Sequence, residues 1–329
     1  MGKKNNAMLD YLENNRRFAD IFNGFFGKGK EIVEPQYLSE GNEKLDGSLV
    51  KNLHIDEKSE PIERIRDVKK IYKNGQILQI LCIEDQEYID YTSAVRTLTM
   101  DALEYNRQID EIKDYHIHMN DVKGDEYMSK MRRDEKLNPV ITLWWYHGKN
   151  TYDGPMCLKD SLKSFDNELD DYVADYKMNI LFTDSEFDFN NFHTEFRELY
   201  RTLAVRNDKI AMKELVTNDP VFKNIDLDTF DLITRYTDQR KIFKQKRKYK
   251  NREGGYDMCK AMKDWAEDER AEGRTEGRTE GRIEGRIERD KEKIAEMLTR
   301  GKTVEAIADF CGYPIDLVRE VEQSLLVTQ

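Results

Sequence analysis

The dipeptide Asn74-Gly75 separates two apolar runs, and this pattern is the strongest short-range sequence signal for a β-hairpin. If Asn74-Gly75 forms the two-residue loop, Lys73 pairs with Gln76 and Asp67 lies opposite Cys82. The sequence therefore predicts two antiparallel strands. A slip of one residue in their register would turn every side chain of one strand to the other face.

The second strand of this hairpin ends its apolar run abruptly in charged and amide side chains. Glu84 and Gln86 share one face because side chains alternate along a strand, and Asp67 points to the same face, diagonal to Glu84. Diagonal neighbours lie roughly 7–8 Å apart, so the two carboxylates can approach one cation such as Mg²⁺. The structural alternative is that Glu84 marks the exit of the strand into solvent, with Asp67 paired to Arg66 or Lys69.

The rest of the chain suggests helices on a small mixed sheet. A long amphipathic helix follows the hairpin from Tyr91 to Ile109, and an apolar strand follows at 139–148, which together predict an α/β sandwich. A further strand is expected at 177–182, and helices are expected at 8–27, Phe192–Val205, Lys209–Val216 and Leu227–Tyr236. The segments 31–60 and 114–138 are polar; the first is expected to be irregular with a short helix and the second to be a loop.

The charge of the chain is uneven. The formal net charge is −11, which is the wrong sign for a simple DNA-binding protein. Residues 240–252 nevertheless contain many cations and no acid, with Phe243 and Tyr249 interleaved. This segment is either a solvated helix face or a surface that contacts a phosphate backbone. The candidate DNA-binding residues are Arg240, Lys241, Lys244, Lys246, Arg247, Lys248, Lys250 and Arg252.

Residues 272–288 repeat the motif Glu-Gly-Arg with a period of four. Each glycine costs about 1 kcal/mol in a helix relative to alanine, and the glutamates repel one another at i, i+4. The segment is therefore either a flexible tether or a helix whose small residues allow close pairing in a homo-oligomer. The tail beyond it resembles a helix-turn-helix, with Thr303 as a helix cap, but the acids of its second helix favour protein contact over DNA contact.

The cysteines and the hydropathy pattern indicate a cytoplasmic protein. Cys82, Cys157, Cys259 and Cys311 lie far apart, without the close pairs of a zinc or disulfide framework. No segment approaches the about 18 consecutive apolar residues of a membrane span, and no apolar stretch follows the basic N-terminus. We therefore expect no membrane association. The pair His116 and His118 is expected in a loop or at a strand end, not in a metal site.

In their order, these features resemble the PD-(D/E)XK nuclease superfamily, and more closely the Rpn family of recombination-promoting nucleases, also described as transposases. The resemblance covers most of residues 8–290. It rests on FADIFNGFF, the strand ending in IEDQ, the helix DYTSAVRTLTMDALEY, the strand PVITLWWYHG and the EGR repeat. It implies a restriction-endonuclease-like α/β core and a Mg²⁺-dependent DNA endonuclease, a phosphodiester hydrolase of DNA recombination and mobile elements.

The resemblance assigns roles to particular residues. Asp67 matches the aspartate of the motif, Glu84 the (D/E) and Gln86 the position of the lysine, so that these three would be catalytic and Asp67 and Glu84 would hold Mg²⁺. Arg96 matches a recurring arginine that would orient the scissile phosphate. Asp20 would add an outer-shell carboxylate.

The chain departs from the superfamily pattern at two positions. Arg66 stands in place of proline, and Gln86 stands in place of lysine and brings no positive charge. Lys69, on the same predicted face as Asp67, is the candidate for the missing cation. The second hypothesis is therefore a catalytically weak or inactive nuclease-fold protein that binds DNA or a protein partner and self-associates through its tail.

Four regions are expected along the chain. Residues 1–188 would form the nuclease-like domain and residues 189–265 a helical extension that carries the basic segment. Residues 266–290 would form the repeat linker or helix, and residues 291–329 the small helical tail.

Overall fold

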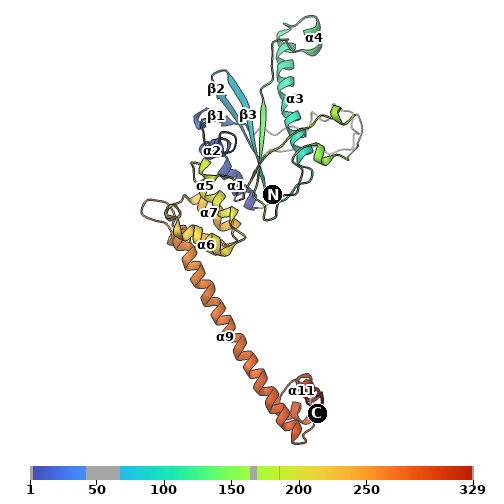
Figure 1. Cartoon of the computed structure of the whole chain (residues 1–329), viewed down its shortest axis with the longest axis vertical. Coiled ribbons are helices and arrows are strands. Elements are labelled where there is room, and N and C mark those ends of the chain that lie inside the picture. Colours follow the sequence, from blue (N-terminus) through green and yellow to red (C-terminus); the bar gives the residue numbers. More distant parts are fainter. Residues whose placement is uncertain (1–2, 42–66, 164–168, 185, 328–329) are drawn as a thin grey trace. The chain divides into compact units, whose positions relative to one another are not determined.

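A computed structural model describes residues 3–41, 67–163, 169–184 and 186–327. The chain divides into two compact units, Met1–Ala261 and Met262–Gln329 (Figure 1). In the described ranges, no helix combines the length and the hydropathy that crossing a membrane requires. Of the segment 31–60, the described residues 31–41 contain a 3-10 helix, Pro35–Tyr37, and a strand, Leu38–Glu40, which was not predicted from the sequence. Residues 42–60 and Arg66 lie outside the described residues.

The first unit contains a five-stranded mixed sheet in the order β1-β2-β3-β4-β5. The first three strands are antiparallel, whereas β3, β4 and β5 run parallel. The helix α3 (Ser93–Met119) connects β3 to β4, as a parallel crossover requires. The strands are β1 Leu38–Glu40, β2 Val68–Asn74, β3 Ile77–Gln86, β4 Val140–Tyr146 and β5 Asn179–Phe182. The predicted α/β class with a small mixed sheet is thereby confirmed.

The hairpin of β2 and β3 is present, but its predicted register is wrong by two residues. Asn74 pairs with Ile77 and Lys69 pairs with Cys82, so the loop residues are Gly75 and Gln76. Gly75 has a φ of 61° at the first loop position, which is where a type II′ turn takes glycine. A shift of two leaves every side chain on its predicted face, because the strand period is two.

Helices cover both faces of the sheet (Figure 1). On one face α3 packs against β4, and its Tyr105 contacts the cluster around Cys82. On the other face, Trp145 of β4 packs edge to face against Phe196 of α5 (Phe196–Ala204), and the helix α1 (Lys3–Leu12) contacts β3. Neighbouring residues of β3 therefore point into two different helical layers.

The N-terminal segment predicted as one helix consists of two. The helix α2 (Asn15–Phe25) starts anew because Asn14 caps it, accepting hydrogen bonds from the backbone N–H groups of Arg16 and Arg17. The apolar spacing continues through the break, which hides it in the sequence. Positive φ values at Lys28 and Gly29 then end the helical segment.

The polar segment predicted as a loop after α3 is partly helical. The helix α3 continues to Met119, and α4 spans Asp125–Ser129. His116 lies in the last turn of α3 and is buried, with its two ring nitrogens 2.6 Å from Asp121 Oδ1 and 2.9 Å from Glu135 Oε1. These contacts tie the helix end to the excursion that follows, so the expected loop or strand-end position of His116 is wrong.

The helices after β5 pack against the N-terminal helices. Helix α7 (Leu227–Tyr236) has the predicted bounds, and the side chain of Arg17 on α2 forms ion pairs of 2.9 and 3.0 Å with Asp226 and Asp228 at the start of α7. The first unit continues through these helices to Ala261. The remaining elements of this region are α6 Lys209–Asn218, α7 Leu227–Tyr236 and α8 Arg240–Lys244.

The repeat segment is helical. It lies within α9 (Met258–Thr299), and added β-carbons at Gly273, Gly277, Gly281 and Gly285 would meet no atom within 4 Å apart from their chain neighbours and the nearby helix backbone. The end of α9 packs with α10 (Val304–Cys311) and α11 (Ile315–Val327) around Ile294, Ile307 and Val318. The predicted cap is confirmed, because Thr303 Oγ1 accepts a hydrogen bond from Ala306 N at 3.3 Å.

Candidate active site

The predicted carboxylate pair forms at one end of the β2–β3 hairpin. Continuing the register by one residue beyond the pair Val68 and Ile83 places Asp67 directly opposite Glu84, instead of diagonal to it. Asp67 is partly buried, and Glu84 has 0 % of its surface exposed. The alternative in which Glu84 leads the strand into solvent is therefore wrong.

The position of Asp67 is fixed by one backbone hydrogen bond. The N–H of Asp85 donates to Asp67 Oδ2 at 2.8 Å. The other carboxylate oxygen, Oδ1, has no hydrogen-bond partner among the described residues. Burial, followed by the negative charge of Glu84, raises the pKa of the Asp67 carboxyl to about 7. A carboxylate pair of this kind retains a proton near neutral pH. A bound cation that replaces this proton would stabilise the pair.

Arg96, the predicted phosphate-orienting residue, reaches this pair from the first turn of α3. Its Nη2 lies 2.9 Å from Glu84 Oε2 and its Nη1 lies 2.9 Å from Asp90 Oδ2. The guanidinium also lies over the ring of Trp144, 4.8 Å from the centroid. Although burial opposes it, hydrogen bonds from Thr92 and the charge of Arg96 hold the pKa of Asp90 below its usual value.

Two other predicted residues lie on the same face of the sheet with different partners. The Lys69 ammonium, proposed as the missing cation, is 3.3 Å from Glu104 Oε2 on α3, and Arg107 contacts the same carboxylate at 2.7 Å. The side chain of Gln86 is partly exposed, and its amide has no hydrogen-bond partner among the described residues. Gln86 is therefore free to contact a ligand, whereas the charge of Lys69 is matched by a buried glutamate.

Asp20 belongs to another part of the first unit. Its carboxylate accepts hydrogen bonds from His193 N, from Thr194 N at 2.8 Å and from Thr194 Oγ1 at 2.6 Å, just before α5. These bonds give Asp20 a structural role in positioning α5. The structure does not bring it to the pair of Asp67 and Glu84.

Behind the site lies a buried pair that the sequence reasoning missed. Asp85 Oδ1 is 2.7 Å from His147 Nε2, and both side chains are almost fully buried on the face opposite Glu84. The ring of His147 packs against Trp145 and Tyr236. The backbone carbonyl of His147 accepts a hydrogen bond from Arg206 Nη2. His147 thus anchors the residue whose backbone N–H holds Asp67. The sequence signal that could have revealed this pair is the alternation of side chains along β3, which turns Asp85 to the face opposite Glu84.

The basic segment is exposed and begins at the same end of the sheet as the carboxylates. Asp238, two residues before it, lies 3.6 Å from Lys149, which follows β4. Ile242 and Tyr249 are buried and anchor the segment, whereas seven of its cations are exposed and Lys246 is partly buried. Tyr249 does not lie on the exposed surface with the cations, because its ring is buried and packs on Phe230.

The pair of Asp67 and Glu84 fits a Mg²⁺ ion. Such an ion is usually held by one or two protein carboxylates and keeps several waters. The unpartnered Oδ1 of Asp67 and the raised pKa of that carboxyl are consistent with this donor set. In the part of the chain that the structure describes, no group of three or more His, Cys, Asp or Glu side chains is arranged to hold a metal.

Neither a family model, nor a curated protein, nor a solved structure matches this chain.

Proposed function

We propose that the protein is a Mg²⁺-dependent DNA endonuclease of the PD-(D/E)XK type, related to the recombination-promoting nucleases. The observation that carries the proposal is the position of Asp67 opposite the fully buried Glu84, with the pKa of Asp67 raised to about 7 by burial and by Glu84. Two carboxylates held together at this energetic cost are typical of a cation site.

Each residue at the sheet edge has a role in this proposal. Asp67 and Glu84 would hold Mg²⁺, which supplies a more acidic bound water and neutralises charge on a phosphate. The Gln86 amide orients water or a phosphate oxygen by hydrogen bonding. Arg96 contacts Glu84 at 2.9 Å and presents its charge next to the site.

DNA is the proposed substrate because of the basic segment. Residues 240–252 start near the carboxyl ends of the parallel strands, where Glu84 and Gln86 also lie. Exposed lysines and arginines that follow one another along a short helix and turn can contact successive phosphates. This local surface is compatible with a net charge of −11 for the whole chain.

The test is nicking of supercoiled plasmid by the full chain with Mg²⁺ or with EDTA. Asp67→Asn and Glu84→Gln keep the side-chain shapes and should each reduce the rate by about 100-fold or more. Lys213→Gln, an exposed position on α6, is the matched control and should nick like the wild type. Metal-independent nicking, or nicking that survives both substitutions, would contradict the proposal.

A second candidate function is DNA or partner binding without turnover. Two contacts favour it: Arg96 already neutralises Glu84, and Lys69 is paired with Glu104 and not with the reacting centre. Folded wild-type protein that retards DNA in a gel but nicks none of several DNA forms with Mg²⁺ or Mn²⁺ would support this function. Loss of retardation after substitution of Arg247 and Lys250 by glutamine would place the DNA on the basic segment.

A further inference from the structure

A cavity of about 830 Å³ lies between α2 and the residues that lead into α5. Neither Asp67, Glu84 nor Gln86 lines it. It is therefore separate from the candidate active site, and its chemistry does not depend on the proposed nuclease activity. A concave site of this size with convergent polar groups is large enough for a small metabolite.

Most polar side chains around this cavity serve the fold. Asp20 accepts its hydrogen bonds from residues 193 and 194, and Asn23 binds the backbone of residues 32 and 33. Arg17 is held by Asp226 and Asp228. These groups form a rigid wall and have little capacity left for a ligand.

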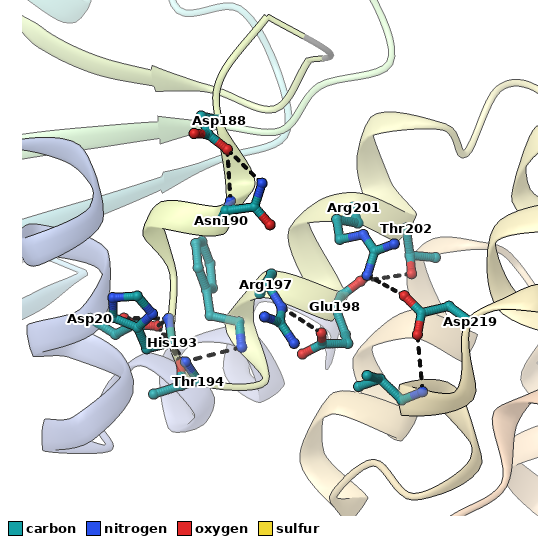
Figure 2. A network of polar contacts seen from close by, with 12 residues as sticks. Asp20, Asp188, Asn190, His193, Thr194, Arg197, Glu198, Arg201, Thr202 and Asp219 are labelled. Carbon is teal, nitrogen blue, oxygen red and sulfur yellow. Dashed lines mark hydrogen bonds and ion pairs between the residues drawn. The ribbon is translucent and has the colours of Figure 1, made fainter. Parts of the chain in front are cut away.

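Arg197 and Glu198, in the first turn of α5, differ from the other lining residues. Figure 2 shows the two side chains next to each other, with the cluster around Asp20 on one side and the pair of Arg201 and Asp219 on the other. Arg197 Nε donates to Glu198 Oε1 at 2.8 Å. Among the described residues, the two terminal nitrogens of Arg197 have no hydrogen-bond partner, and the Glu198 carboxylate otherwise accepts a hydrogen bond only from its own backbone N–H.

The glutamate of this pair is built into the protein and is not a surface side chain. Glu198 has 2 % of its surface exposed, and burial raises the pKa of its carboxyl despite the adjacent Arg197. A buried carboxylate is costly, and a cationic donor on a ligand would stabilise it. The side chain of Arg197, with 34 % exposed, leaves its planar fork of donors accessible from the cavity.

Charges of both signs remain for a ligand. Arg16 and Arg197 contribute positive charges, while Glu31, Glu195 and Glu198 contribute negative ones. A simple anion or a simple cation would meet a like charge at this wall. A ligand that carries both charges on neighbouring atoms would meet both partners, since Arg197 and Glu198 are themselves in contact.

We propose that this cavity binds a free α-amino acid as its zwitterion. The carboxylate of the ligand accepts hydrogen bonds from the Arg197 fork, in the bidentate geometry that guanidinium groups favour. The ammonium group donates to Glu198 Oε2. Pro35 and Val221 on the wall offer apolar surface to the ligand's side chain.

The test measures melting of the full chain and calorimetric binding with each standard L-amino acid in turn. At least one should raise the melting temperature by several degrees at about 100-fold excess over its Kd. The N-acetyl derivative of that amino acid lacks the ammonium and its amide lacks the carboxylate, so both should bind at least 10-fold more weakly. Inorganic phosphate should not bind.

Variants locate the site. Arg197→Gln, at a partly exposed position, and Glu198→Gln should each weaken binding by 10-fold or more, whereas Lys213→Gln on α6 should not. If Glu198→Gln fails to fold, Arg197→Gln decides alone. The proposal is overturned if no amino acid binds, if the acetylated and amidated forms bind equally well, if phosphate alone binds, or if Arg197→Gln binds normally.

Discussion

Glu84 and Glu198 invite comparison because both are buried glutamates with an arginine in contact. Glu84 lies 2.9 Å from Arg96, and Glu198 lies 2.8 Å from Arg197. The difference is the third group. Asp67 adds a second carboxylate beside Glu84, whereas the groups that act on Glu198 are Arg197, its own backbone N–H and the charge of Arg201. One arginine therefore leaves an excess of negative charge at the sheet edge and a balanced pair on α5.

This difference explains why similar pairs suit different ligands. Two carboxylates and one guanidinium favour a compact cation that both carboxylates can share. One carboxylate and one guanidinium favour a molecule with both charges. Glu104 is also buried, and its carboxylate is fully paired, because Lys69 and Arg107 both contact it. Counting the charges that reach a buried carboxylate thus separates candidate sites from structural ion pairs.

The largest expected effect on stability is that of Asp67→Asn. The pKa of this carboxyl rises from 3.8 to about 7 in the folded protein, so the folded state binds the proton more tightly than the unfolded chain. Stability then falls as the pH rises from about 4 to about 7. At pH 8 without Mg²⁺, Asp67→Asn should raise the unfolding free energy by up to about 4 kcal/mol. Urea unfolding at pH 4 and pH 8 measures this, and an equal effect at both pH values would contradict it.

The next effect separates the two arginines. Arg96→Gln leaves Glu84 buried beside Asp67 and should destabilise the protein by about 3 kcal/mol. Arg197→Gln leaves Glu198 as a single buried carboxylate on which the charge of Arg201 still acts, and should cost less, about 1 kcal/mol. Urea midpoints at pH 7 without added metal compare the variants. Equal costs would show that the second carboxylate does not distinguish the two sites.

The smallest effect is a difference of a few degrees in melting temperature. Mg²⁺ at millimolar concentration should raise the melting temperature of the wild type through mass action. Glu84→Gln should remove this increase, whereas Glu198→Gln should retain it. Differential scanning calorimetry with Mg²⁺ and with EDTA makes the comparison. Loss of the increase in both variants would mean that the two sites are not independent.

The sequence predicts the side-chain faces at the site better than the distances between its groups. Alternation along β3 places Asp67, Glu84 and Gln86 on one face, and this survives the two-residue error in the register. That error arose because Gly75 takes the first loop position with its φ of 61°, and the pattern Asn-Gly does not say which loop position the glycine occupies. Strands β4 and β5 were visible as apolar runs.

The contacts that complete both sites come from residues distant in the chain. His147 meets Asp85 across 62 positions, and the cavity beside Glu198 depends on α2. Within its own helix, Glu198 looks like one of many charged residues next to an arginine. Its burial follows from the packing of α5 against α2 and α7, which local periodicity does not encode.

The hairpin also restricts how this protein can change its length. Removing or adding one residue in β2 between Asp67 and the turn would send Asp67 to the face of α7 and a neighbour to the face of Glu84. Removing or adding two would keep the carboxylate in place and move only the turn, which is exposed at Gly75 and Gln76. Insertions and deletions among natural variants of this strand are therefore expected in pairs, so the spacing of the two carboxylates changes in steps of two.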